Sequence, residues 1–133
     1  MSLYQQLQAR QANGQMIRVG LIGAGKFGSM YLSQIPRTPG IHLVGIADLS
    51  PDQARQNLVR VGWNKEQTTA ATLDEALRDG RTHISDDWVS LVKHPEIDVI
   101  VECTGHPIAA VEHCLTAIVT GKQNFDEIGR AHV

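Results

Sequence analysis

Apolar residues of this chain gather in short runs, and stretches with helix-like spacing of apolar positions separate them. Two runs rich in β-branched residues, 17–22 and 41–47, predict strands. A run over 98–105 predicts a strand buried on both faces, and Thr82-His-Ile-Ser85 predicts a shorter strand before it. Strands that alternate with helices are typical of an α/β domain.

Helices are expected where a capping residue precedes apolar positions at helical spacing. Thr72 opens one such segment, and Asp86 or Asp87 opens another. Ser50-Pro51-Asp52-Gln53 is a compact helix start, because serine can cap, proline suits the first turn and glutamine can reach back. The expected helices lie within residues 3–13, 26–35, 50–62, 72–80, 86–95 and 107–121.

Right-handed crossovers between these elements predict a doubly wound parallel sheet of the Rossmann type, with the strands in the order 3-2-1-4. The loops 23–28 and 103–105 then meet at the point of the sheet where ligands bind. Residues 122–133 are polar and contain no β-branched run, so we expect no fifth strand. The sheet would be incomplete at its C-terminal end, and strand 98–105 would form an exposed edge.

The last residues differ in character from the rest of the chain. Ile128-Gly-Arg-Ala-His-Val133 looks like the in-frame translation of a common sequencing adapter, which does not belong in fold reasoning. We therefore expect three parts: a helical extension over 1–16, a binding domain over 17–123 and a non-native tail over 124–133.

Size and charge narrow the classes of function. The 133 residues suffice for one core, and a net charge of -2 gives no electrostatic case for nucleic acid or a membrane surface. No apolar run reaches the roughly 18 residues of a spanning helix, and the polar N-terminus lacks the apolar centre of a signal peptide. Cys103 and Cys114 suit a reducing compartment, so the cytoplasm is the expected location.

The loop Gly23-Ala24-Gly25-Lys26-Phe27-Gly28 follows the first strand directly and has the spacing G-x-G-x-x-G. Gly23 permits a tight turn, Gly25 lets the backbone approach a pyrophosphate, and Gly28 lets the next helix lie against the sheet. The start of that helix directs N–H groups and partial positive charge at the phosphates. A strand before the loop and a helix after it are the context that predicts dinucleotide binding.

Asp48 ends the second strand, twenty residues after Gly28. Its carboxylate is placed to accept hydrogen bonds from the adenosine ribose hydroxyls, and its charge would repel a 2′-phosphate. Leu49-Ser50 follows without an arginine, so NAD is the expected cofactor. Arg55 on the next helix keeps NADP open.

Three segments carry a resemblance to a known family: VGLIGAGKFG at 19–28, HLVGIADLSP at 42–51 and IDVIVECTG at 97–105. Together they resemble the N-terminal cofactor domain of homoserine-dehydrogenase-like oxidoreductases, nearest to the group with a C-terminal SAF domain. Sugar and polyol oxidoreductases of the Gfo/Idh/MocA type share this layout. The likeness covers roughly residues 1–122.

The resemblance implies a set of cofactor contacts and a missing half. It assigns the pyrophosphate to Gly23, Ala24, Gly25, Lys26, Phe27 and Gly28, the adenosine to Asp48 and Leu49, and the nicotinamide ribose to Cys103, Thr104 and Gly105. The parent would transfer hydride to or from a small hydroxy or oxo compound, and this chain alone would bind cofactor without turnover. The expected partners are a dinucleotide, the parent's small substrate and further copies of the chain.

The cysteines and histidines near the end of the predicted strand 98–105 could also serve as metal ligands or in catalysis. Cys103, His106, His113 and Cys114 are zinc-ligand types, but adjacent residues on a helix point about 100° apart and do not easily share one ion, so no metal site is expected. For Cys103, packing is favoured over a nucleophile, because no general base is identifiable nearby. His106 is expected to serve the start of the helix that follows it.

Further residues have structural interpretations. Glu102 lies inside an apolar strand, where an unpaired charge is costly; it faces the binding crevice or pairs with a backbone donor, and we favour the latter. Trp63 and Trp88 are expected to pack helices against the sheet. For the whole chain, the alternatives to an oxidoreductase domain are a non-catalytic module that senses dinucleotides and a cofactor-free fold.

Overall fold

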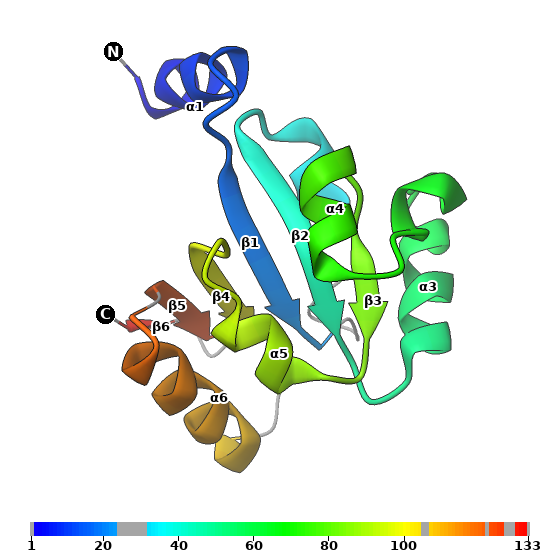
Figure 1. Ribbon diagram of the computed structural model, residues 1–133, viewed down its shortest axis with the longest axis vertical. Helices are drawn as coiled ribbons and strands as arrows, with labels where there is room; N and C mark the ends of the chain where they lie inside the picture. The colour runs from blue at the N-terminus through cyan, green and yellow to red at the C-terminus, as the bar shows by residue number, and fades with distance from the viewer. Residues whose placement is uncertain (1, 24–31, 105–106, 122, 127–129, 133) are drawn as a thin grey trace.

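The structure is a computed structural model that describes residues 2–23, 32–104, 107–121, 123–126 and 130–132. Within these residues, six strands form one sheet in the order β3-β2-β1-β4-β5-β6 (Figure 1). Neighbouring strands run parallel except for β5 and β6. The strands are β1 (Ile17–Ile22), β2 (Ile41–Ala47), β3 (His83–Ser85), β4 (Val99–Glu102), β5 (Gln123–Asp126) and β6 (Arg130–His132). The expected order 3-2-1-4 is confirmed.

The helices begin where capping residues predict them. Thr72 accepts a hydrogen bond from the Glu75 N–H, and Asp87 accepts one from the Ser90 N–H. The described helices are α1 (Leu3–Ala12), α3 (Pro51–Arg60), α4 (Leu73–Asp79), α5 (Trp88–Lys93) and α6 (Pro107–Val119), with 3-10 turns η1 (Ile35–Arg37) and η2 (Lys65–Thr68). Residues 32–34 are helical, and the first part of the helix expected over 26–35 lies outside the described residues. No described helix is long and apolar enough to cross a bilayer.

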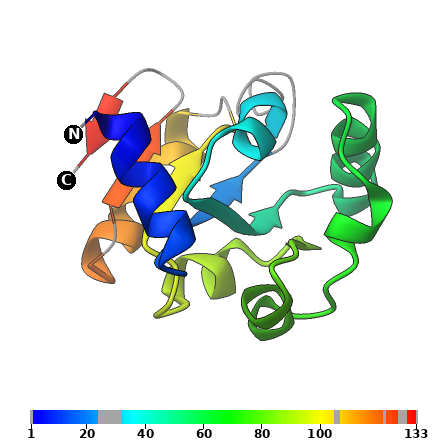
Figure 2. The same cartoon turned by 90° about the horizontal axis from the view of Figure 1, so that it is seen from above.

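Helices cover both faces of the sheet, as a doubly wound fold requires. On one face, strand residues pack against α3 through Leu58. On the other face, they pack against α4 through Ala76 and against α5 through Leu91. Figure 2 shows α4 and α5 on the same side of the sheet. The two apolar layers enclose the strands and fix where their ends lie.

Two glycines of the central strands make room for α5. A Cβ at Gly45 would lie 2.6 Å from Leu91 Cδ1, and a Cβ at Gly20 would lie 3.0 Å from the same atom. The missing side chains let Leu91 reach the sheet, where it is almost fully buried. This close packing sets the position of α5, which begins at Trp88.

The expectation of no fifth strand is wrong. Strand β5 pairs in parallel with β4, from Val99 opposite Gln123 to Glu102 opposite Asp126. A β-ladder is built from backbone N–H and C=O groups, so a polar segment can pair when the preceding helix delivers it to an open edge. Strand β4 is therefore an interior strand and not the exposed edge that we expected. Strand β6 adds to β5 in the antiparallel direction.

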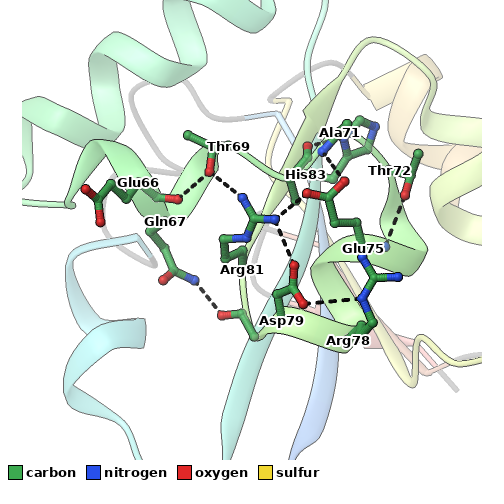
Figure 3. A network of polar contacts seen from close by, with 12 residues as sticks. Glu66, Gln67, Thr69, Ala71, Thr72, Glu75, Arg78, Asp79, Arg81 and His83 are labelled. Atoms are coloured by element: carbon green, nitrogen blue, oxygen red, sulfur yellow. Dashed lines mark hydrogen bonds and ion pairs between the residues drawn. The ribbon is translucent and has the colours of Figure 1, made fainter.

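A polar network around Arg81 ties the start of β3 to α4 (Figure 3). The guanidinium donates hydrogen bonds to Glu75, Asp79 and Thr69. The hydrogen bond from Arg81 holds the pKa of the Asp79 carboxyl below its usual value. Arg81 precedes β3, so this network lies at the amino end of that strand. Because β3 runs parallel to β2 and β1, the carboxyl ends of these strands lie at the opposite edge of the sheet.

Candidate functional site

The carboxyl ends of β1, β2 and β4 are joined by backbone hydrogen bonds. The Gly23 N–H donates to the Ala47 carbonyl at 2.7 Å, and the Cys103 N–H donates to the Ile22 carbonyl at 2.7 Å. Three segments that are far apart in the sequence therefore meet at one edge. This is the edge where parallel α/β sheets bind ligands.

Gly23 lies directly against the turn that follows β4. Its φ is +87°, and a Cβ there would lie 3.0 Å from the carbonyl carbon and oxygen of Cys103 and 3.0 Å from the Thr104 nitrogen. Any side chain would therefore strain the backbone and press on a second backbone segment. The expected meeting of the first glycine with the Cys103-Thr104 segment is found in the structure.

Asp48 holds the turn between β2 and α3. Its N–H donates to the Ser85 carbonyl at 2.8 Å, and its Oδ1 accepts the Ser50 N–H at 2.9 Å. The Ser50 side chain makes no capping hydrogen bond, so the serine cap that we expected is wrong. The Ser50 residue instead takes part through its own N–H, which donates to the Asp48 carboxylate. This bond holds a half-buried carboxylate at the carboxyl end of β2, and the Leu49 side chain beside it is 95% exposed.

The Cys103 side chain is 3% exposed and belongs to the apolar core beside Val101 and Leu21. The packing role expected for this thiol is confirmed. At the end of β4, the backbone of Cys103 and Thr104 remains the part of this turn that faces Gly23. The turn therefore contributes backbone atoms to the candidate site, and the Cys103 thiol lies in the core.

Glu102 is the fully buried last residue of β4. Its Oε1 accepts the Thr104 N–H at 2.7 Å, so the expected pairing with a backbone donor is confirmed. Its Oε2 forms a short contact with Nδ1 of His113 on α6. Burial by itself would raise the pKa of the Glu102 carboxyl, but the contacts with His113 and Thr104 outweigh burial and hold that pKa below its usual value.

Sequence reasoning missed the partnership of Glu102 with His113. The sequence suggests the His113 imidazole only as a metal-ligand type, whereas in the structure it contacts a carboxylate and packs against the Trp88 ring, with centroids 4.4 Å apart. The available signal was the cost of an unpaired acid in an apolar strand, which calls for a polar partner on the helix that follows.

Several predicted contacts fall outside the described residues. They are Ala24, Gly25, Lys26, Phe27, Gly28 and Gly105, together with His106, one of the four residues of zinc-ligand type. Another cluster of ligand types, Asp74, His94 and Glu96, is found among the described side chains. Both ring nitrogens of His94 are engaged there, with the Asp74 carboxylate and the Glu96 N–H. A metal would have to displace these bonds.

The described residues also line two cavities away from this edge. The larger, about 740 Å³, lies beside β3 and is bounded by α3 and η2. The smaller, about 470 Å³, lies near the amino end of β2. Neither is lined by Gly23, Asp48 or Cys103. The candidate site is therefore located by the polar groups at the carboxyl ends of the strands.

A comparison with protein families decides what kind of domain this is. Residues 17–127 match the Gfo/Idh/MocA family, described as an oxidoreductase family with an NAD-binding Rossmann fold. This chain belongs to the Gfo/Idh/MocA oxidoreductase family. The match spans every strand from β1 to β5, so it covers the five parallel strands, including the three whose carboxyl ends form the site. The family is described as NAD-binding, in agreement with the cofactor expected from the glycine loop.

Individual members of this family, and solved structures, are similar to the chain over part of their length. An inositol 2-dehydrogenase/D-chiro-inositol 3-dehydrogenase from Lactiplantibacillus plantarum is 27% identical over 117 residues, which is 87% of this chain and 28% of that protein. The myo-inositol dehydrogenase of Lactobacillus casei, solved with NAD(H) and myo-inositol, has a TM-score of 0.62 at 20% identity over 84% of this chain and 28% of its own. This second likeness shows the fold alone.

Homoserine dehydrogenase from Thiobacillus denitrificans is a further structural neighbour of this Gfo/Idh/MocA chain. Its TM-score is 0.60 at 25% identity, over 83% of this chain and 23% of that protein. The resemblance seen in the sequence is thus supported at the level of the wider oxidoreductase family. The chain spans about a quarter of the length of these three proteins.

Proposed function

We propose that residues 17–123 form the NAD-binding domain of an oxidoreductase, preceded by a helical extension over 1–16. In the parent protein, hydride would pass between the nicotinamide and a small hydroxy or oxo compound. Inositol and homoserine, named in the similar proteins, are both small hydroxy compounds. The 133-residue chain alone would bind the cofactor without turnover. Residues 124–133 as an adapter-derived tail, a cytoplasmic location and self-association stay predictions.

The observation that carries this proposal is the contact between Gly23 and the Cys103-Thr104 peptide, beside Asp48. A backbone that tolerates no Cβ at the end of β1 supports the tight turn that a dinucleotide loop requires. A carboxylate at the end of β2 supports recognition of ribose hydroxyls. The family match over residues 17–127 supports the same cofactor.

Each described residue has a distinct duty in this proposal. Gly23 turns the chain sharply out of the sheet, so that the loop after it can approach the pyrophosphate. Asp48 accepts hydrogen bonds from the adenosine ribose, with Leu49 as the neighbouring apolar contact. The backbone of Cys103 and Thr104 borders the nicotinamide ribose. The bound cofactor itself supplies the hydride chemistry.

We propose NAD in preference to NADP, and the surroundings of Arg55 support this choice. Arg55 is the nearby cation that could attract a 2′-phosphate, but its Nη1 lies 3.0 Å from Asp52 Oδ1 on the same helix. Asp48 places its carboxyl group at the end of β2, where the 2′-hydroxyl would lie. A 2′-phosphate at this position would be repelled by the Asp48 carboxylate, and the Arg55 guanidinium is paired with Asp52.

The test is a titration of the 133-residue chain with NADH and with NADPH, followed by nucleotide fluorescence. The chain should bind NADH more tightly than NADPH by about tenfold, the factor that corresponds to about 1.4 kcal/mol. Asp48→Ala should weaken NADH binding and reduce that preference, because the ribose acceptor and the repulsion are both lost. Arg55→Ala is the matched control and should leave both affinities unchanged. Absence of saturable NADH binding by a folded sample would overturn the proposal.

A further inference from the structure

Glu102 uses its two carboxylate oxygens for two different elements. Oε1 accepts the Thr104 N–H at 2.7 Å, two residues along its own chain. Oε2 contacts Nδ1 of His113, which lies eleven residues further on in α6. The glutamate is fully buried and His113 is 6% exposed. A buried carboxylate therefore bridges the end of β4 to the helix layer above it.

The Thr104 nitrogen links the buried carboxylate to the space beside Gly23. It donates to Glu102, and it is one of three backbone atoms 3.0 Å from the position of a Cβ on Gly23. The hydrogen bond to the carboxylate therefore fixes the same peptide that borders the first glycine of the loop. Movement of this peptide would change the distance between the two segments that form the candidate site.

We propose that Glu102 is a positioning residue for the cofactor: held by His113, it fixes the Cys103-Thr104 peptide against Gly23 and thereby sets the affinity for NAD. This inference rests on the proposed function, because it assigns a determinant of that same site. The side chain of Glu102 does not touch the cofactor. It acts through the backbone of Thr104.

His113 is itself held from a second element. Its ring lies against Trp88, with centroids 4.4 Å apart and planes tilted by 57°. Trp88 opens α5, and the core residue Leu91 on that helix is anchored in the space above Gly20 and Gly45. Contacts therefore run from the helix layer through His113 and Glu102 to the Thr104 N–H. These contacts let an acid occupy a fully buried position of the strand.

The test compares NADH affinity in variants of the 133-residue chain. Glu102→Ala removes the acceptor and should weaken binding about tenfold, the scale expected for a lost hydrogen bond to a charged group. Glu102→Gln should restore the affinity to within about threefold, because its amide oxygen can accept the Thr104 N–H and its amide group can donate to a neutral His113. A merely structural role would not favour the conservative variant in this way.

Two further variants separate positioning from stability. Ile97→Val trims a buried side chain just before β4 and should lower stability without changing the NADH affinity of the folded protein. His113→Phe keeps a ring beside Trp88 but removes the contact to Glu102, so NADH affinity should fall even if Glu102→Ala does not fold. The amide proton signal of Thr104 reports the hydrogen bond directly and should move upfield in Glu102→Ala and stay near its wild-type position in Glu102→Gln.

The outcomes distinguish the two proposals. If the wild-type chain binds NADH, and Glu102→Ala or His113→Phe binds it equally well, the positioning role is overturned and the proposed function stands. If the affinity falls equally in Ile97→Val, the effect is one of stability and the positioning role is again overturned. If the folded wild-type chain does not bind NADH, both proposals fail together.

Discussion

Gly23 shows that a glycine can be required both by its own backbone and by a neighbouring segment. Its place in the loop was predicted from the sequence, because a strand precedes it and two more glycines follow. The loop sequence does not show which segment lies where a Cβ on Gly23 would be. It follows from the strand order, which places the end of β4 beside the end of β1.

Replacement of Gly23 by alanine should therefore cost more than replacement of Gly62. Both glycines have positive φ, +87° and +99°, but nothing lies within 4 Å of a Cβ at Gly62. Gly62→Ala should lower the free energy of unfolding by about 1 kcal/mol through backbone strain alone. Gly23→Ala should lose a further 1–3 kcal/mol, roughly the cost of overpacking. Urea denaturation of both variants measures the difference, and equal losses would contradict the contact at Gly23.

Glu102 was understood only in part from the sequence. Its backbone partner was expected, because a buried acid needs a donor, whereas the same cost does not say which polar residue of α6 faces it. Which face of α6 meets the end of β4 depends on how α5 and α6 pack together. That information lies in Trp88 and Leu91, which no local pattern connects to the strand.

The lowered pKa of Glu102 predicts a dependence of stability on pH. The unfolded carboxyl takes up a proton at higher pH than the folded one, so the carboxylate stabilises the fold at neutral pH. This contribution should be lost as the pH falls below about 4.3, the ordinary glutamate value, and through the folded pKa. Glu102→Gln should show a shallower fall in the free energy of unfolding over this range. An unchanged acid limb would show that the carboxylate is not preferentially ionised in the folded protein.

The best predicted elements are strands with a run of buried apolar residues and helices with a capping residue at their start. Strands β1 and β2 match their expected residues, and Thr72 and Asp87 cap the helices that they were expected to open. Strand β4 ends at Glu102, before the expected Gly105, because the buried acid turns the backbone at Thr104. Strand β5 was missed, because its pairing depends on the neighbouring β4 and not on apolar residues of its own.

Two helix starts give a matched test of capping. The Thr72 side chain accepts the Glu75 N–H at 3.1 Å, whereas the Ser50 side chain makes no capping hydrogen bond. Thr72→Ala should lower the free energy of unfolding by about 1 kcal/mol. Ser50→Ala should change it little, because the Ser50 N–H keeps its bond to Asp48. Thermal or urea unfolding decides this, and a larger loss at Ser50 would contradict the observed cap geometry.

For the whole molecule, the sheet explains why one edge carries the function. Parallel strands place all their carboxyl ends together, and the strand order reverses between β1 and β4, which is the point where such sheets bind ligands. The family match spans β1 to β5, whereas the relatives extend over a chain more than three times as long. The cofactor site could therefore be inferred from this sequence, and the substrate site could not.

The most direct test of the account is an amide-resolved NMR titration of the 133-residue chain with NADH. Saturable shifts should concentrate at the carboxyl ends of three strands, in Gly23, in the Asp48-Leu49 turn and in Cys103-Thr104. The network around Arg81, at the amino end of β3, should remain unperturbed. Shifts confined to the cavity beside β3, or no saturable shifts in a folded sample, would contradict the assignment of this edge as the NAD site.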